Sequence, residues 1–209
     1  VDSLGKWSVN VADALAQGVH DYTVTAKDTG GNMKTLFGSV TVDTTASLLS
    51  GNGLSDDTDM GSSNTDNITN NATPVIVGTG ENGDVITIVI HTKTYTATVN
   101  SSNNWSVAVT DALSDGTYNY TVKAEDTAGN TSNTSGSITI DTTPPGLADN
   151  GLNDASDTGS SNSDNITKKT IPVIEGTGDS GDVITVLINS KAYTTAVAIN
   201  GKWSVTVAD

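Results

Sequence analysis

The chain has 209 residues and a formal net charge of −15 at pH 7, with 24 acidic residues against nine lysines and no arginine. Such an acidic chain is a poor partner for nucleic acid, because contacts to phosphate supply most of the affinity of those complexes. No apolar run approaches the roughly 18 residues that span a bilayer, and the absence of cysteine excludes disulfides, thiolate metal sites and cysteine nucleophiles.

Alternating apolar residues predict short strands along the middle of the chain. Ile86, Ile88 and Ile90 share one face of one such run, and Trp105, Val107 and Val109 alternate in another. Clusters of Gly, Asn, Asp and Ser separate the runs, and no stretch shows helical periodicity of useful length. In chain order the seven predicted strands lie at 67–69, 74–77, 85–90, 95–99, 105–109, 118–124 and 138–140.

This pattern recurs with a period of 98 residues, which is the spacing between the three tryptophans, without insertion or deletion. We interpret the chain as a window on a tandem array. Residues 1–45 would supply the last three strands of one repeat, 46–145 a complete repeat, and 146–209 the first part of a third repeat.

Seven short strands with turns roughly every 8 to 12 residues are typical of an immunoglobulin-like sandwich. A propeller blade would need a period about half as long. Trp105 is expected to pack between the two sheets as the main aromatic of the core. The prediction is therefore an all-β chain of tandem immunoglobulin-like β-sandwich domains.

Several segments of the second repeat resemble a known family. The segments PVIVGTGENGDVIT (74–87), DGTYNYTVKAEDTAGN (115–130) and SITIDTTPP (137–145) resemble bacterial Ig-like repeats. Together with the loop DTGSSNSDNIT (157–167), they are most similar to the giant, type I-secreted, non-fimbrial adhesins of enteric bacteria. The resemblance implies an extracellular stalk on the bacterial surface, stiffened by Ca²⁺ at the domain junctions.

The acidic residues also point to calcium without the resemblance. Of the 24 acids, 21 are aspartate, and no lysine lies between Lys34 and Lys93 or between Lys123 and Lys168. Clustered carboxylates repel one another unless they bind a hard cation through several oxygens. The alternative is that they are solvated loop residues, and Asp28 and Asp126 could simply hold hydrogen-bonded turns. The calcium candidates are Asp43, Asp59, Asp66, Asp84, Asp126, Asp141, Asp157, Asp164 and Asp182.

Sandwich topology predicts that these aspartates meet where one repeat ends and the next begins. Loops 79–84 and 126–133 are expected at the end where a repeat starts, and loop 110–116 at the opposite end. The second junction would then gather Asp111, Asp115 and Asp141 from one repeat and Asp149, Asp154, Asp157, Asp164, Asp179 and Asp182 from the next.

Two motifs that suggest enzymes fail on their context. The glycines at 78, 80 and 83 match a dinucleotide fingerprint, but a predicted strand follows where the fingerprint needs a helix. Asp157-Thr158-Gly159 matches the aspartic protease loop by letter, but its counterpart reads Asp59-Met60-Gly61. We therefore expect no enzyme.

Two functions remain open. The first is a calcium-rigidified spacer, whose partners are the neighbouring repeats of the same chain and which presents an adhesive region outside this fragment to host cells or surfaces. The second is a binding module that itself contacts a host glycan or protein. The second requires an exposed aromatic or apolar patch on one domain, whereas the aromatics are expected at strand positions shared between repeats.

Overall fold

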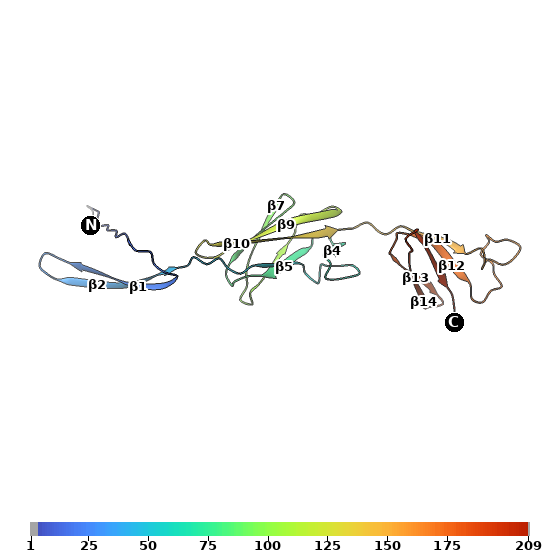
Figure 1. The fold of residues 1–209 in the computed structure, drawn as a ribbon, viewed down its shortest axis with the longest axis horizontal. Helices are drawn as coiled ribbons and strands as arrows, with labels where there is room; N and C mark the ends of the chain where they lie inside the picture. Colours follow the sequence, from blue (N-terminus) through green and yellow to red (C-terminus); the bar gives the residue numbers. More distant parts are fainter. Residues whose placement is uncertain (1–3, 209) are drawn as a thin grey trace. The chain divides into compact units, whose positions relative to one another are not determined.

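The structure, a computed structural model, describes residues 4–208 and consists of strands joined by loops and turns. Two compact units divide the chain, Val1–Thr142 and Thr143–Asp209 (Figure 1). In the described residues, no helix is long and apolar enough to cross a membrane. The all-β fold predicted from the sequence is confirmed.

The first unit begins with a long hairpin. Strands β1 (Gly18–Lys27) and β2 (Met33–Val42) pair antiparallel over their whole length. The repeat also predicts a strand around Trp7, but residues 6–12 form none. The counterpart of that strand, β8, pairs with β5 in the next repeat, and residues 4–44 contain no counterpart of β5. Without a partner strand, the apolar alternation around Trp7 is not enough to form a strand.

The repeat that follows is a two-layered sandwich. One sheet has the order β4-β10-β9-β6-β7 and the other the order β3-β5-β8. The described residues from 50 to 140 thus form eight strands rather than the predicted seven. The additional strand, β3, was missed because its sequence SGNGL has no apolar alternation. The bounds are β3 (Ser50–Leu54), β4 (Ile68–Thr69), β5 (Val75–Thr79), β6 (Val85–Ile90), β7 (Lys93–Thr98), β8 (Asn104–Ala108), β9 (Gly116–Glu125) and β10 (Thr131–Ile140).

Trp105 lies in the core of this sandwich, as predicted, with 2% of its surface exposed. Its indole N–H donates a hydrogen bond to the carbonyl of Thr79 at 3.1 Å. The ring lies against Gly78, where a Cβ would overlap both the ring and the carbonyl oxygen of Ser50. The first glycine of the dinucleotide-like motif therefore makes room for a core tryptophan, and a strand follows the motif.

The second unit repeats most of this sandwich. One sheet contains β11 (Leu147–Leu152), β12 (Val173–Gly178) and β15 (Lys202–Thr206), which correspond to β3, β5 and β8. A second sheet contains only β13 (Val183–Ile188) and β14 (Lys191–Ala196), the counterparts of β6 and β7, within the described residues. The packing of the tryptophan is kept here as well, because Trp203 is 6% exposed and lies against Gly176.

Candidate metal sites

Each repeat has a proximal end, where its first strand begins, and a distal end, where that strand stops. In the central repeat, Ser50 pairs with Thr79, so the turn 80–84 lies at the proximal end, while the loop 55–74 follows Leu54 at the distal end. The N–H of Asp141 donates to the carbonyl of Thr69 at 2.9 Å. The chain therefore leaves the repeat beside its distal loop.

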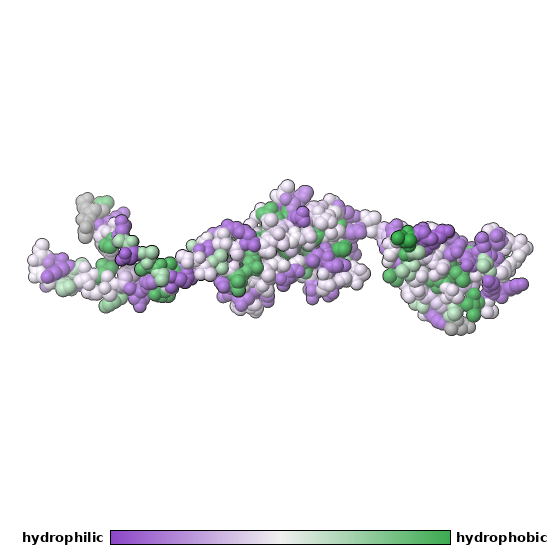
Figure 2. Space-filling view, viewed as in Figure 1, coloured by the Kyte–Doolittle hydropathy of each residue, from purple (hydrophilic) through white to green (hydrophobic). Residues whose placement is uncertain are grey.

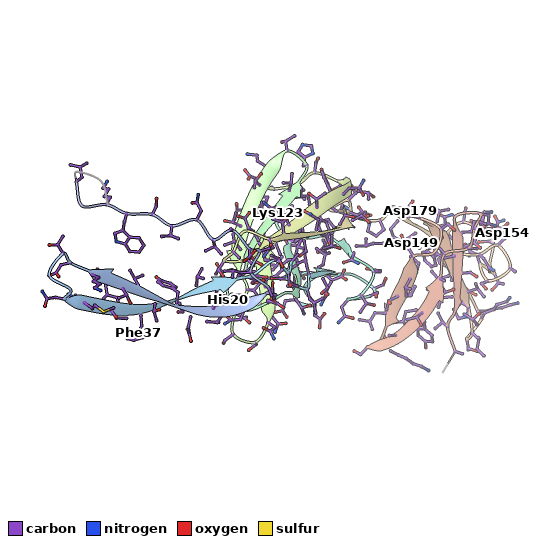
Figure 3. The ribbon with its side chains drawn as sticks, turned by 60° about the vertical axis from the view of Figure 1, so that its left-hand side comes forward. His20, Phe37, Lys123, Asp149, Asp154 and Asp179 are labelled. Atoms are coloured by element: carbon purple, nitrogen blue, oxygen red, sulfur yellow. The ribbon has the colours of Figure 1, made fainter. Side chains whose placement is uncertain are left out.

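This arrangement corrects one expectation. In the second unit, β11 pairs with β12 from Leu147 opposite Gly178 to Leu152 opposite Ile174. Asp154, Asp157 and Asp164 therefore lie in the distal loop, whereas Asp179 and Asp182 lie at the proximal end. Figure 3 shows Asp179 toward one end of this unit and Asp154 toward the other.

The prediction that these aspartates gather at one end of the repeat was wrong. The cause is the strand that the sequence did not reveal. β11, like β3, carries the chain across the sandwich before the aspartate-rich loop begins.

The distal loop of the central repeat contains a buried carboxylate, Asp59, which is 4% exposed. Its Oδ2 accepts the N–H of Asn67 at 3.1 Å. Its Oδ1 is buried and has no hydrogen-bond partner in the part of the chain that the structure describes. Asp66 lies nearby in sequence, but its Oδ1 accepts the N–H of Ile68 at 3.1 Å and so holds a local turn.

The distal loop of the second unit repeats these contacts 98 residues later. Asp157 is 5% exposed, and its Oδ2 accepts the N–H of Asn165 at 3.1 Å. Its Oδ1 is again buried without a partner among residues 4–208. Asp164 bonds the N–H of Ile166 at 3.0 Å, as Asp66 bonds Ile68. The two loops thus make the same hydrogen bonds at corresponding residues.

A hollow of about 430 Å³ opens beside Asp157. Most of its wall carries oxygen, but it also includes a lysine, which takes the place of Asn70 in the first loop. Backbone and side-chain oxygens of this kind are the ligands that calcium prefers. The lining residues are Asp157, Thr158, Gly159, Ser160, Ser161, Asn162 and Lys168.

An asparagine that was not among the predicted site residues organises each loop. Asn67 has φ 60°, and its Oδ1 accepts the N–H of Leu54 at 2.7 Å, which ties the loop to the end of β3. Asn165 has φ 58° and bonds Leu152 at 2.7 Å in the same way. Asparagine tolerates this left-handed conformation better than most residues. The signal in the sequence was the recurrence of this asparagine, which follows Asp66 in the first loop and Asp164 in the second.

The proximal end contains, in each repeat, a second carboxylate with a buried oxygen atom. Asp84 is 4% exposed, and its Oδ2 is buried without a partner in the described residues, as is Oδ2 of its counterpart Asp182. In the central repeat, the hydroxyl oxygens of Ser47 and Ser132 are also buried and unpartnered within residues 4–208. Ser47 lies just before β3, and Ser132 lies near the start of β10, opposite Ala124. Several oxygens at this end therefore lack hydrogen-bond partners.

Asn130 connects two of the predicted ligands, Asp43 and Asp126. Its Nδ2 donates to Asp126 Oδ2 at 2.9 Å and to the carbonyl of Asp43 at 3.2 Å. The hydrogen bonds that Asp126 accepts from the side chain and the backbone N–H of Asn130 lower the pKa of the Asp126 carboxyl. Asn32 lowers the pKa of Asp28 by the same contacts. The hydrogen-bonded turn that the sequence left open as an alternative is formed at both positions.

The remaining acidic candidates make other contacts. Asp43 Oδ1 accepts from Gln17 Nε2 at 2.8 Å. Asp115 Oδ1 accepts both the N–H and the hydroxyl of Thr142, at 2.9 and 2.6 Å, immediately after the predicted ligand Asp141, whose side chain is exposed. These acids order the ends of β2 and β10.

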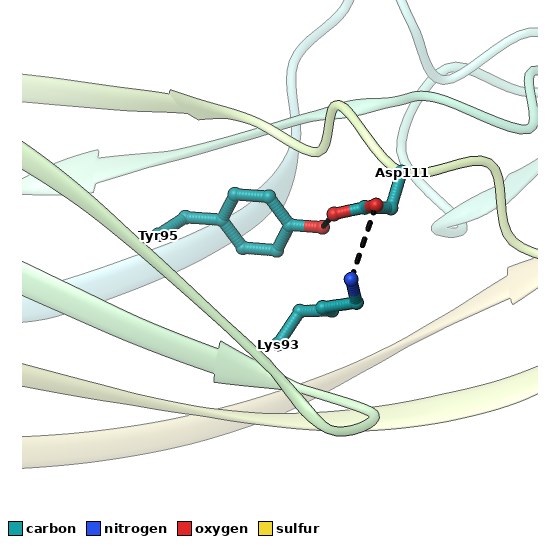
Figure 4. A network of polar contacts seen from close by, with 3 residues as sticks. All are labelled: Lys93, Tyr95 and Asp111. Atoms are coloured by element: carbon teal, nitrogen blue, oxygen red, sulfur yellow. Dashed lines mark hydrogen bonds and ion pairs between the residues drawn. The ribbon is translucent and has the colours of Figure 1, made fainter.

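Asp111 belongs to a surface network with Lys93 and Tyr95 (Figure 4). Its carboxylate accepts from the Tyr95 hydroxyl at 2.9 Å and from Lys93 Nζ at 3.3 Å. These contacts lower the pKa of Asp111, whereas burial and the bond to Asp111 raise the pKa of Tyr95. Asp111 therefore has a cationic partner, unlike the buried aspartates.

No group of three or more acidic or histidine side chains able to hold a metal occurs within residues 4–208. A calcium ion at either end would therefore need carbonyl, hydroxyl or amide oxygens in addition to one or two carboxylates.

Two aromatics depart from the expectation that aromatics occupy shared positions: Tyr118, whose counterpart is His20, and Phe37. Phe37 on β2 is 82% exposed (Figure 3), and its counterpart is Ser135. It lies opposite Thr23 in the hairpin. This exposed ring is the kind of feature that a binding module would use.

The chain matches a known protein family repeat by repeat. A model of the bacterial Ig-like domain matches residues 1–44, 47–142 and 146–209. Comparison with curated proteins finds no match. One similar solved structure is described by the words "Ca2+-stabilized adhesin helps an Antarctic bacterium reach out and bind ice". It is 32% identical, with 100% of this chain and 53% of that chain covered and a TM-score of 0.40.

Two further structures also come from adhesins. One concerns host cell surface retention of a 1.5-MDa bacterial ice-binding adhesin and is 25% identical, with 92% of this chain and 64% of that chain covered and a TM-score of 0.34. A bacterial immunoglobulin-like domain from the M. primoryensis ice-binding adhesin is 30% identical, with 46% and 97% covered and a TM-score of 0.31.

The chain spans less than two thirds of the length of the two larger structures. With TM-scores below 0.5, these superpositions establish no functional similarity. The match to the family model is of a different kind, because it covers nearly the whole chain in three consecutive segments. The chain therefore belongs to the bacterial Ig-like domain family.

Proposed function

We propose that this chain is a spacer segment of a bacterial surface adhesin, stiffened by calcium bound to its repeated aspartates. The observation that carries the proposal is a set of buried carboxylate oxygens without hydrogen-bond partners in the described residues. They occur at Asp59 and Asp84 and again, one period later, at Asp157 and Asp182. A buried, unpaired carboxylate oxygen is costly, and coordination to a cation removes that cost.

The surroundings of these oxygens fit calcium better than a proton or a lysine. Calcium accepts six to eight oxygen ligands in flexible geometry, including hydroxyls and backbone carbonyls. The loop 59–69 is composed of Gly, Ser, Thr, Asn and Asp apart from Met60 and Ile68. At the proximal end, Ser47 adds a buried hydroxyl to Asp84. The other predicted ligands are weaker candidates. Four of them already accept hydrogen bonds from protein groups, namely Asp43, Asp66, Asp126 and Asp164. The fifth, Asp141, has an exposed side chain.

The function that follows is mechanical. A flexible linker coils, and its reach grows only as the square root of its length, whereas rigid domains in series extend in proportion to their number. Calcium at the two ends of each repeat would restrict the motion of one domain against the next. Outside the cell, the resulting stalk would hold an adhesive region, located elsewhere in the protein, at a distance from the bacterial surface.

Export also suits this design. In a cytosol that is poor in calcium, the junctions would stay loose during type I secretion and would stiffen in the medium. If the dissociation constant were about 10 μM, about 1 mM external calcium would stabilise the folded chain by about 2.7 kcal/mol. One matched structure is described as a Ca²⁺-stabilized adhesin, which names the same ion in that protein.

Calcium titration by calorimetry tests the proposal. Asp59→Asn and Asp84→Asn should each remove one binding event or weaken it about tenfold or more, because each replaces a charged oxygen ligand. Asp57→Asn is the matched control, since Asp57 lies in the same loop and is exposed, and its counterpart is Ala155. Absence of calcium binding at millimolar concentration, or an equal effect of Asp57→Asn, would contradict the proposal.

A second measurement addresses stiffness. Excess EDTA should lower the melting temperature and broaden the distance distribution from small-angle X-ray scattering, and added calcium should restore both. Magnesium at the same concentration is the control, because it requires a smaller and more regular octahedron of ligands. Unchanged melting and scattering in EDTA would leave the spacer without its calcium mechanism.

The exposed ring of Phe37 favours a second candidate function, a binding module that contacts a host glycan or protein. A glycan array and a pull-down from host cell surfaces, each run with the chain and with Phe37→Ala, would test it. Specific binding that is lost in Phe37→Ala supports this second function, and absence of binding argues against it.

A further inference from the structure

The chain enters the central repeat through β3 and leaves it through β10, and both strands run from the proximal to the distal end. β3 begins beside the proximal turn 80–84 and stops at Leu54, where the distal loop starts. β10 begins opposite Glu125, which pairs with Val85 next to that turn, and ends at Ile140. A pull on the two ends of the repeat therefore draws β3 toward the proximal end and β10 toward the distal end, each along its own axis.

This direction of pull matters because of the way strands are bonded. Hydrogen bonds between antiparallel strands lie across the strands, so sliding one strand lengthwise loads all of its bonds together. Lifting a strand sideways from one end loads them one after another. The pairing of β3 with β5, and of β10 with β9 and β4, therefore resists a lengthwise pull collectively. On the face of the central repeat seen in Figure 2, apolar side chains form only small patches, so this face offers little apolar surface that could share the load with a neighbour.

Asn67 bonds both the first and the last strand of the repeat. Its Oδ1 accepts the N–H of Leu54 at the end of β3 at 2.7 Å. Its carbonyl accepts the N–H of Thr139 in β10 at 2.8 Å. The side chain reaches Leu54 because residue 53 is a glycine, where a Cβ would overlap the side chain of Asn67. Neither strand can slide past Asn67 without breaking a bond to this one residue.

The short strand β4 is itself held in place. It runs parallel to the end of β10, and the carbonyl of Thr69 accepts the N–H of Asp141 at 2.9 Å. Thr69 is 1% exposed, and its hydroxyl donates to the carbonyl of Thr58 at 2.6 Å. The hydroxyl of Thr58 in turn accepts the N–H of Val75, at the start of β5, at 3.1 Å. β10 is thus connected through β4 to the middle strand of the other sheet.

The second unit repeats the part of this arrangement that involves its first strand. Asn165 accepts the N–H of Leu152 at the end of β11 at 2.7 Å, and its own N–H donates to Asp157 at 3.1 Å. Residue 151 is again a glycine, where a Cβ would overlap the asparagine. Glycine would adopt the backbone conformation of Asn165 with less strain, so the bond made by the amide oxygen is what the asparagine adds.

We propose that Asn67 and β4 form a clamp between the first and last strands of the repeat, and that this clamp keeps the repeat folded under tension along its axis. The proposed spacer function supplies the source of the load, because a cell held by its adhesin pulls on the stalk. Stiffness is a different property, since it resists bending between domains and not the opening of a domain. The clamp consists of protein hydrogen bonds and needs no calcium, so its tests are run in EDTA.

Single-molecule force spectroscopy of the full chain tests the direction of the resistance. The chain has no cysteine, so attachment points can be introduced. Thr45→Cys with Pro144→Cys pulls the central repeat lengthwise, whereas Ser101→Cys with Thr127→Cys pulls it sideways from two exposed turns at the proximal end. The lengthwise pull should need about twice the force or more, because its hydrogen bonds are loaded together. Equal forces in both directions would overturn the proposal.

Asn67→Gly tests the clamp residue. Glycine adopts the φ of 60° and removes the bond to Leu54, so lengthwise unfolding at constant force should become about fivefold faster, as expected for the loss of one hydrogen bond. Asn103→Gly is the matched control, because Asn103 has φ 61° in the exposed turn between β7 and β8, and it should change the rate by less than about twofold. Equal acceleration by both variants would contradict the role of Asn67.

The sideways pull separates loss of the clamp from a general loss of stability. Val107→Ala removes buried methyl groups from β8 and should weaken the repeat in both directions. Asn67→Gly should weaken it lengthwise far more than sideways. Weakening by Asn67→Gly in equal proportion in both directions would show that Asn67 supports the fold in general, and would overturn the clamp. The calcium proposal would be unaffected by that result, because no calcium is present in these measurements.

Discussion

Residues 4–44 share a sequence pattern with the last part of the central repeat, but the two regions differ in how far the tryptophan of the pattern is buried. Trp105 is 2% exposed in the central repeat, and Trp7 is 57% exposed in residues 4–44. Trp203 is 6% exposed, although residues 146–208 include no counterparts of β9 and β10. Trp105 and Trp203 share a partner strand that carries a glycine beneath the ring, whereas no such strand for Trp7 occurs within residues 4–208. Burial of this tryptophan is thus decided by one neighbouring strand.

The same contrast explains why β8 and β15 form and the segment around Trp7 does not. All three have alternating apolar residues, but a single strand gains little until a partner supplies hydrogen bonds and a covering face. The hairpin β1–β2 forms because its partner is only five residues away along the chain. Local pattern therefore determines which residues can be strands, and long-range pairing determines which become strands.

The largest expected effect comes from removing the tryptophan. Trp105→Ala should destabilise the central repeat by about 3–5 kcal/mol, because it leaves a large cavity beneath Gly78. Trp7→Ala is the matched control and should change stability by less than about 0.5 kcal/mol. Differential scanning calorimetry at low protein concentration measures both. A comparable loss from Trp7→Ala would mean that residues 4–44 have a packed core of their own.

A smaller effect is expected from the valine on the middle strand of the sheet. Val122 is fully buried, and Val122→Ala should cost about 2 kcal/mol, in line with the loss of two buried methyl groups. Val24→Ala, its counterpart in the hairpin, should cost much less in dilute solution. Chemical denaturation of both variants gives the two values.

Much of the fold could be predicted from the sequence, because the apolar alternation that marks a strand occurs in more than one repeat. Ile86, Ile88 and Ile90 alternate in one repeat, and Ile184, Val186 and Ile188 alternate in the next. The strand SGNGL could not be predicted this way, because β3 is held by pairing with β5 across a bulge and not by apolar alternation. That one omission also reversed the end of the repeat at which Asp157 was expected.

The candidate sites were predicted in part. Recurrence selected Asp59 and Asp84, which the structure shows to be buried with an unpartnered oxygen in the described residues. The exposed Asp57 does not recur, because its counterpart is Ala155. Recurrence could not separate these from Asp66 and Asp126, which repeat equally well but bond their own turns. Burial depends on the packing of the whole repeat, whereas a turn depends on a few neighbouring residues, and both are kept from repeat to repeat.

The two distal loops offer a comparison within the proposed function. The loop around Asp157 has Ala155 where the first loop has Asp57, and its hollow is lined by Lys168 in place of Asn70. Because the control variant treats the exposed Asp57 as no ligand, the ammonium of Lys168 is the difference that matters, and it should make calcium binding at this loop several-fold weaker, about 1 kcal/mol, than at Asp59. Titrations of Asp59→Asn and Asp157→Asn isolate each loop.

Exchange of the lysine provides the control. Lys168→Asn should strengthen binding at the second loop, and Asn70→Lys should weaken binding at the first. Equal affinities in the two loops, unchanged by either exchange, would show that these side chains lie too far from the ion to matter.

The smallest expected effect concerns pH and the turns at Asp126 and Asp28. Hydrogen bonds from Asn130 hold the pKa of Asp126 below that of an unfolded aspartate, so this turn stabilises the fold above the ordinary aspartate pKa. That contribution is lost as the pH falls through the lowered pKa of the folded state. Asn130→Ala should raise the pKa of Asp126 toward its ordinary value and reduce the dependence of central-repeat stability on acid pH. NMR titration of the carboxyl and denaturation at several pH values measure these two changes.

The matched variant Asn32→Ala separates the turn from the sandwich behind it. It should raise the pKa of Asp28 in the same direction, because Asn32 makes the same bonds to Asp28. It should leave the stability of the central repeat unchanged, since the turn 28–32 closes the isolated hairpin. Asn130→Ala differs because it also removes the bond to the carbonyl of Asp43. If Asn32→Ala lowered the stability of the central repeat as much as Asn130→Ala does, the effect of Asn130→Ala could not be assigned to its bond with the carbonyl of Asp43.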